Sequence, residues 1–277
     1  MKVLFRKTII ASLLAICLPA ASFAAEYTIK YGHVGPVTSD DQVPGEFLKS
    51  FLEARSNGRI TVEIYPGAQL GNFRDMIEQV QLNTLELTHT TVGGIANFWP
   101  ELQVTDIPYM MNGDSIAEHI AQSSFFDEVR DEILKATGNV RLVAVGNTGR
   151  WRNFFTTKKL IKSAADMKGV KMRTINSPLQ IEFIKALGGN PTPVAWGELY
   201  TSLQTGVVEG TKNAATDIIP TKMYEAVKYV TLDEHAYLFG FWWMSDAWLQ
   251  SLPADLQDLV IDGVQQASMI QGDWNKE

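Results

Sequence analysis

The sequence predicts an α/β protein of two lobes, each a mainly parallel sheet flanked by helices, with a ligand cleft between the lobes. Strand-like and helix-like segments alternate from residue 27 onward, and a second alternating series begins near Gly146. The chain of 277 residues is also longer than the commonest single domain, so it can bury two cores. Loops at the carboxyl ends of parallel strands usually carry ligand-binding residues, so we expect the site at these loops.

The first series has five elements in βαβαβ order. Residues 27–31 alternate apolar and polar side chains as a strand does, while residues 43–54 have helical spacing. Two loops at strand ends, residues 33–39 and 90–97, are expected to face a ligand. The remaining elements are strands at 60–65 and 85–89 and a helix at 73–82.

The second series places an arginine at a strand end. Residues 170–173 alternate as a strand, so Arg173 lies at its carboxyl end, and residues 147–152 form a polar, arginine-bearing turn. Residues 238–244 form an aromatic strand. The other expected elements are strands at 141–145, 207–209 and 230–232 and helices at 178–187, 197–204, 223–229 and 254–268.

The first 24 residues have the pattern of a secretory signal peptide. Three basic residues precede an apolar run that is too short to span a bilayer, and small residues at Ser22 and Ala24 suit cleavage before Ala25. The only cysteine, Cys17, lies in this segment, so the exported chain is expected to have no disulfide or thiol chemistry. After this segment we expect lobe I at 25–146, lobe II at 147–232 and a return to lobe I at 233–277.

Charge and motifs exclude several classes of function. The formal net charge is −7 and becomes more negative without the basic signal segment, which opposes binding to nucleic acid and to anionic lipid headgroups. Hydrolase, zinc-protease and phosphate-loop motifs are absent from the sequence, and the four histidines have no ligand-like spacing. We expect no metal, no cofactor and no enzymatic activity, and we interpret His89 as a core histidine.

Several ordered segments resemble the extracytoplasmic solute-binding proteins of TRAP transporters. The most specific are Asp166–Arg173, with the sequence DMKGVKMR, and the stretch from Pro191 to Gly210 that leads to Asn213. Tyr65–Gly71 and Ile107–Tyr109 also match. The resemblance implies a periplasmic protein whose two lobes close around a ligand and deliver it to a membrane permease driven by an ion gradient.

The resemblance also implies a set of ligand-binding residues. Arg173 falls on the arginine that holds the ligand carboxylate, and a guanidinium suits this role because its planar fork matches two carboxylate oxygens. Asn213 matches a pocket asparagine, and Trp196 matches an aromatic pocket position. A second arginine corresponds to Arg152, or to Arg150 with a shift in register.

From the first lobe, the loop that begins at His33 and Thr91 match ligand-facing positions. Thr91 stands where sialic-acid-binding members have an acidic residue, which disfavours sialic acid. The resemblance leaves C4-dicarboxylates, 2-oxo acids and sugar acids as ligand classes. It also implies that further elements follow Glu277, so that the second lobe lacks part of its outer layer.

Other interpretations stay open from the residues alone. Arg173 could form a surface salt bridge, and Asn213 could form a turn. A sensory subunit that presents its closed form to a receptor has the same sequence features as a transport subunit. A periplasmic enzyme acting on a sugar acid is the alternative from another class, although no general acid and base pair is evident.

Overall fold

The computed structural model describes residues 25–275, and the expected signal peptide with Cys17 lies outside these described residues. Among them, no helix is both long enough and apolar enough to cross a membrane.

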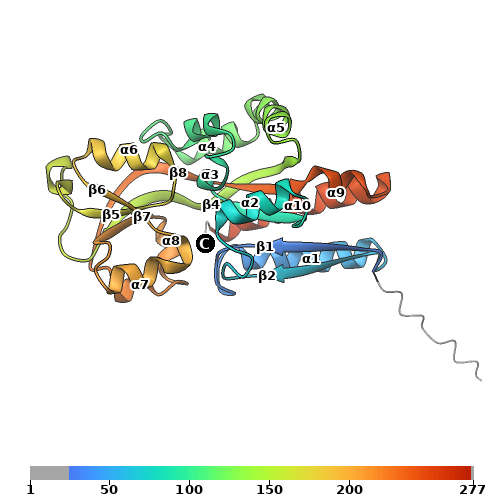
Figure 1. The fold of residues 1–277 in the computed structure, drawn as a ribbon, viewed down its shortest axis with the longest axis horizontal. Helices are drawn as coiled ribbons and strands as arrows, with labels where there is room; N and C mark the ends of the chain where they lie inside the picture. The colour runs from blue at the N-terminus through green and yellow to red at the C-terminus, as the bar shows by residue number, and fades with distance from the viewer. Residues whose placement is uncertain (1–24, 276–277) are drawn as a thin grey trace, which may run out of the picture.

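One sheet of eight strands runs through the described chain, in the order β2-β1-β3-β8-β4-β7-β5-β6. β1 pairs in parallel with β2 and β3, and β5 pairs in parallel with β6 and β7, whereas the two central strands pair antiparallel with each other. The predicted α/β class is confirmed, with two parallel halves joined through an antiparallel centre (Figure 1). The strands are β1 Tyr27–Gly32, β2 Ile60–Tyr65, β3 Leu87–Thr90, β4 Val140–Thr156, β5 Lys171–Thr174, β6 Asn190–Pro193, β7 Gly210–Asn213 and β8 Tyr229–Ser245.

Helices cover both faces of this sheet (Figure 1). The α-helices are α1 Gln42–Arg55, α2 Phe73–Gln81, α3 Val92–Ile95, α4 Asp114–Ala121, α5 Ser124–Thr137, α6 Pro178–Ala186, α7 Leu199–Gln204, α8 Ala215–Ile218, α9 Asp246–Gln250 and α10 Ala254–Trp274. Short 3-10 helices are η1 Pro100–Asp106, η2 Ala164–Met167, η3 Trp196–Glu198 and η4 Met223–Glu225.

The aromatic run of β8 is buried on both faces of the sheet. Phe241 and Trp243 belong to one apolar core with residues of α2, α3 and α5, while Trp242 belongs to the other core with residues of α1 and α10. Successive side chains of a strand point to opposite faces, so a strand covered on both sides has no polar alternation. This explains why residues 238–244 are almost uniformly apolar.

The segment expected to be a turn at residues 147–152 lies inside the long strand β4. The pairing of β4 with β8 shifts between Asn147 and Arg150, where Gly149 has φ +104° and Arg150 has φ +67°. These residues form a bulge, which adds chain to one strand without ending the sheet. The turn prediction was therefore wrong, because the polar residues mark an irregularity within a strand.

Two other boundaries differ from the sequence prediction. The strand expected at 207–209 begins instead at Gly210, because the backbone N–H of Val208 donates to the carbonyl of Ser202 and the segment bends. The helix expected at 223–229 is only the short turn η4, and Tyr229 already belongs to β8. Both errors come from apolar residues that pack in a core without regular structure.

Gly149 gives a test of the bulge. A Cβ at this position would lie 2.6 Å from the Cβ of Ala214, and φ +104° is costly for any other residue. We expect Gly149→Ala to lower the free energy of unfolding by about 2–4 kcal/mol in urea denaturation. Gly58→Ala is the matched control, since Gly58 has φ +77° with nothing within 4 Å of its added Cβ, and it should lose only about 1–2 kcal/mol. Equal losses would contradict close packing at the bulge.

Candidate functional site

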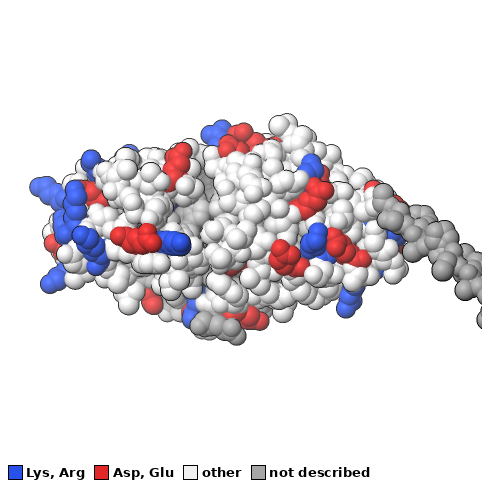
Figure 2. All heavy atoms as spheres, turned by 90° about the horizontal axis from the view of Figure 1, so that it is seen from below, with Lys and Arg blue, Asp and Glu red and all other residues white. Residues whose placement is uncertain are grey.

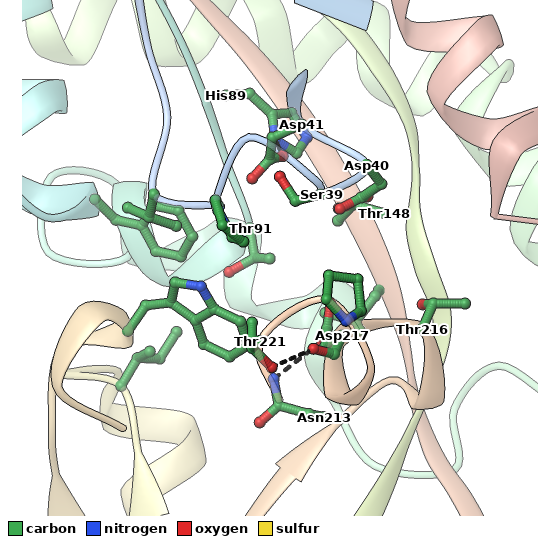
Figure 3. Close-up of a pocket in the computed structure, with 18 of the residues that line it drawn as sticks. Ser39, Asp40, Asp41, His89, Thr91, Thr148, Asn213, Thr216, Asp217 and Thr221 are labelled. Carbon is green, nitrogen blue, oxygen red and sulfur yellow. Dashed lines mark hydrogen bonds and ion pairs between the residues drawn. The ribbon is translucent and has the colours of Figure 1, made fainter. Parts of the chain in front are cut away.

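A cavity lies where the two halves of the sheet meet, and segments from both halves line it (Figure 3). Its first wall comes from the loop after β1, the end of β3 and the middle of β4, and its second wall from β5, β7 and α8. The lining polar residues are Ser39, Asp40, Asp41, His89, Thr91, Thr148, Arg152, Arg173, Asn213, Thr216, Asp217 and Thr221. The loops at the carboxyl ends of parallel strands thus converge on one site, as this topology requires.

Arg173 is the most unusual side chain of the cavity. It is only 3% exposed, yet within the described part of the chain it forms no ion pair. Its Nε donates to the carbonyl of Val194 at 3.0 Å, and its Nη2 is buried without a hydrogen-bond partner. Burial, reinforced by the neighbouring charge of Arg152, lowers the pKa of Arg173 to about 9.

Trp196 covers this guanidinium. The carbon at the centre of the Arg173 guanidinium lies 5.7 Å from the centroid of the Trp196 ring, within the range of a cation–π contact. Trp196 is also part of the cavity wall. The ring therefore both supports the charge and offers an apolar surface beside it.

The structure distinguishes the two other candidate arginines. Arg152 lines the cavity, where its Nε lies 3.4 Å from Asp106 Oδ1 and its Nη1 donates to the carbonyl of Lys212 at 3.3 Å. Arg150 pairs with Asp114 of α4 and does not belong to the cavity lining. Arg150 belongs to the bulge, with φ +67°, whereas Arg152 lies in the regularly paired strand after it, and of the two only Arg152 lines this cavity.

Asn213 and Asp217 form a hydrogen-bonded pair at the end of β7 (Figure 3). The Asn213 amide donates to Asp217 Oδ2 at 3.0 Å, and the backbone N–H of Ala214 donates to the same oxygen at 3.2 Å. Burial and the nearby charge of Asp40 raise the pKa of Asp217 to about 7, against the opposite effect of these hydrogen bonds. Asp217 therefore titrates near neutral pH.

Two carboxyl groups form the opposite wall (Figure 3). Asp40 accepts hydrogen bonds from Thr148 at 2.8 Å and from Asn275 at 3.0 Å, and burial and the charge of Asp41 raise its pKa. Burial alone would also raise the pKa of Asp41, but His89, whose Nδ1 lies 2.8 Å away, lowers it. His89 is thus buried as expected, but it also lines the cavity.

Of the two remaining ligand-binding candidates, Thr91 lines the cavity and His33 does not. Thr91 lines the cavity at the start of α3 (Figure 3). His33 is fully buried outside the cavity lining, where its Nε2 lies 3.1 Å from Gln42 Oε1 and its Nδ1 lies 3.8 Å from Asp41. The structure therefore places His33 beneath Asp41, so other residues of this loop form the wall.

Buried polar atoms without partners gather at this cavity. Besides Arg173 Nη2, the hydroxyls of Ser39 and Thr216 are buried without a hydrogen bond to any described residue. Such atoms are rare in folded proteins because leaving them unsatisfied costs free energy. A polar ligand in the cavity would satisfy them. The described residues contain no group of three or more His, Cys, Asp or Glu side chains that could hold a metal ion.

Sequence reasoning missed the acidic residues of the cavity. Asp40 and Asp41 lie just beyond the loop assigned to residues 33–39, and Asp217 lies in α8, directly after β7. Their positions in the sequence could have indicated them, since each aspartate follows a strand whose carboxyl end faces the cavity.

Comparison with known proteins identifies the family. A family model described as "Bacterial extracellular solute-binding protein, family 7" matches residues 32–277. The chain belongs to this family. A solute-binding protein from Verminephrobacter eiseniae is 31% identical over 251 residues, which cover 90% of this chain and 74% of that protein. The sialic acid-binding periplasmic protein SiaP of Vibrio cholerae is 30% identical, with 89% and 76% coverage.

Solved structures of TRAP periplasmic solute-binding proteins have the same fold as this family 7 protein. One from Polaromonas sp. JS666, bound to D-erythronate, superposes with a TM-score of 0.85 at 27% identity and covers 90% of this chain and 82% of its own. Another, from Roseobacter denitrificans with bound L-galactonate, has a TM-score of 0.86 at 28% identity, with 91% and 83% coverage. The predicted family and two-lobed fold are confirmed.

The raised pKa of Asp217 should make the free energy of unfolding depend on pH. Because folding raises its pKa from 3.8 to about 7, the stability contributed by its protonated form is present at low pH and is lost as the pH rises through about 7. Asp217→Asn stays neutral, so its stability advantage over the native protein should grow by about 1–3 kcal/mol from about pH 5 to about pH 8. Urea denaturation measures it, with exposed Asp258→Asn on α10 as the control. A pH-independent difference would show that Asp217 does not titrate in this range.

Proposed function

We propose that this family 7 protein captures a small carboxylic acid in the periplasm and delivers it to a TRAP permease. The observation that carries this proposal is the buried guanidinium of Arg173, which has no ion-pair partner among the described residues and lines a cavity formed by both halves of the sheet. The relatives of this chain are solute-binding proteins, which supports a binding function rather than catalysis.

A carboxylate is well suited to stabilise Arg173. Removal of a cation from water is costly unless an anion and hydrogen bonds replace the water. Arg173 has one guanidinium nitrogen held by Val194 and another without a partner, so a ligand carboxylate can accept from it. Arg152 adds positive charge beside it, and Asn213 lines the same part of the cavity.

The acidic wall opposite Arg173 narrows the ligand class. Asp40 and Asp41 would repel a second carboxylate but can accept hydrogen bonds from hydroxyl groups. Ser39 and Thr148 add hydroxyls to this wall. This arrangement favours a hydroxylated monocarboxylate, that is a sugar acid, over a C4-dicarboxylate or a simple 2-oxo acid. The ligands of the Polaromonas and Roseobacter proteins, D-erythronate and L-galactonate, are of this kind.

Capture would involve movement of the two halves about the central strands. Segments from both sides contribute to the cavity, so a ligand contacts both only when the halves are close together. Such contacts favour the closed arrangement in proportion to the ligand's preference for it. A closed complex is then the form that a permease would recognise.

Arg173 and Arg150 form a matched pair for testing the anchor. We expect Arg173→Ala to weaken binding of the cognate acid by about 2–5 kcal/mol, because the ligand carboxylate loses its buried partner. Arg150→Ala removes the same charge but breaks only the ion pair with Asp114, so binding should change little. A thermal-shift screen with small organic acids would find the ligand, and calorimetry would measure both variants.

Three outcomes would count against the anchor. Arg173→Ala binding the acid as tightly as the native protein would assign this arginine a structural role. Weaker binding by Arg150→Ala alone would place the carboxylate outside the described cavity. No shift with any acid would contradict the carboxylate proposal.

The acidic wall predicts selectivity between ligand classes. D-Erythronate or L-galactonate should bind at least about tenfold more tightly than succinate, because succinate brings a second charge to Asp40 and Asp41. Calorimetric titration with each acid near neutral pH measures this ratio. Tighter binding of succinate would contradict the assignment of the acidic wall to hydroxyl groups while leaving the Arg173 anchor intact.

A further inference from the structure

A cluster of lysines covers the end of the molecule farthest from α9 (Figures 1 and 2). Figure 2 shows positively charged side chains gathered over the left end, where β5, β6 and α6 lie in Figure 1. Seven exposed lysines make up this cluster, which we call the lysine tip: Lys158, Lys159, Lys162, Lys168, Lys171, Lys185 and Lys228.

Strand pairing brings these lysines together from separate segments. Thr156 at the end of β4 pairs with Gly210 and with Tyr229, and the backbone N–H of Lys228 donates to the carbonyl of Thr156 at 2.9 Å. The backbone N–H of Gly169 donates to the carbonyl of Gly188 at 2.9 Å, which joins the segment before β5 to the end of α6. The tip therefore lies at the amino ends of β5 and β7, opposite the strand ends that carry the cavity.

The positive charge of the tip is only partly neutralised. Lys158 pairs with Glu209 at 2.6 Å and Lys185 with Glu182 at 2.7 Å. Asp166, the only acidic residue between positions 158 and 171, accepts backbone hydrogen bonds from Lys162 and Ser163. That segment has five lysines, in a chain with 24 basic and 31 acidic residues, so positive charge is concentrated here.

Apolar side chains lie among the lysines. Leu160 is 37% exposed, and Tyr229 and Val230, at the start of β8, are 41% and 43% exposed. The hydroxyl of Thr231 donates to the carbonyl of Ile161 at 2.6 Å, which holds the lysine-bearing loop against β8. Lysine heads around apolar side chains are the pattern that suits the boundary between phospholipid headgroups and acyl chains.

We propose that the lysine tip docks this protein on anionic phospholipid headgroups. Lysines are flexible point charges, which suit a fluid, evenly charged surface better than a partner of fixed shape. Clustered lysines gain attraction to such a surface together, and the effect weakens as salt screens it. Docking would hold this solute-binding protein at the membrane where the TRAP transporters of its family work, without occupying the ligand cavity.

The lysine tip can bind anionic lipid although the net charge of the chain is negative. The formal charge of −7 opposes anionic lipids only when charge is averaged over the whole chain. Within about a Debye length of the surface, the local charge of the tip decides the sign of the interaction. The docking proposal does not depend on the identity of the captured acid.

Vesicle binding tests the proposal. The chain without its expected signal peptide would be mixed with vesicles of phosphatidylcholine alone, or with about one third phosphatidylglycerol, at about 25 mM and about 300 mM salt. We expect co-sedimentation with the anionic vesicles at low salt only. The triple variant Lys159→Gln, Lys162→Gln and Lys168→Gln should bind them at least about tenfold more weakly.

A control variant removes equal charge elsewhere. Lys30→Gln, Arg130→Gln and Lys135→Gln together change the net charge by the same amount on the other half of the molecule, and this variant should bind the anionic vesicles as the native chain does. Equal losses in both variants, or no binding by the native chain, would overturn the proposal. Binding to immobilised polyglutamate but not to anionic vesicles would instead assign the tip to an acidic protein partner. Unchanged urea denaturation of both variants would show that they remain folded.

Discussion

The burial of an uncompensated cation shapes the site of this protein. Arg173 is 3% exposed at the carboxyl end of β5, with Trp196 against its guanidinium and no ion-pair partner among the described residues. Desolvation of such a group is unfavourable, so the folded protein sustains a cost that an anionic ligand can offset.

The cavity contains charged groups of both signs. Arg173 and Asp217 lie in the wall formed by β5 and α8, while Asp40 and Asp41 lie in the wall formed by the loop after β1. A site that binds only anionic groups would not be expected to contain three carboxyl groups. The proposed ligand, with one carboxylate and several hydroxyls, would place its carboxylate at Arg173 and donate its hydroxyls to the acidic wall. The raised pKa values of Asp40 and Asp217 have the same origin, because burial disfavours their charged forms.

Two long strands, β4 and β8, connect the two halves of the sheet. β4 and β8 pass through the centre of the single sheet and contribute to both of its halves. The bulge at Gly149 interrupts their pairing beside the cavity, where Thr148 and Arg152 face the site and Arg150 turns to Asp114. The lysine tip lies at the far ends of the same strands. The sheet therefore links a ligand site to a charged surface without placing one in the way of the other.

The sequence by itself determined the α/β class, the family and the strand-end position of Arg173, because hydrophobic periodicity and ordered motifs are local properties of the chain. Only the tertiary structure decided which of Arg150 and Arg152 lines the cavity, since Arg150 itself lies in the bulge, with φ +67°, and pairs with Asp114. It also decided that Asp40 and Asp217, far apart in sequence, share one cavity with Arg173. The lysine tip depends on the same cause: residues 158 to 228 become neighbours only when strand pairing brings their loops together. Charge counted along a chain gives its sum, whereas recognition depends on where the fold places each charge.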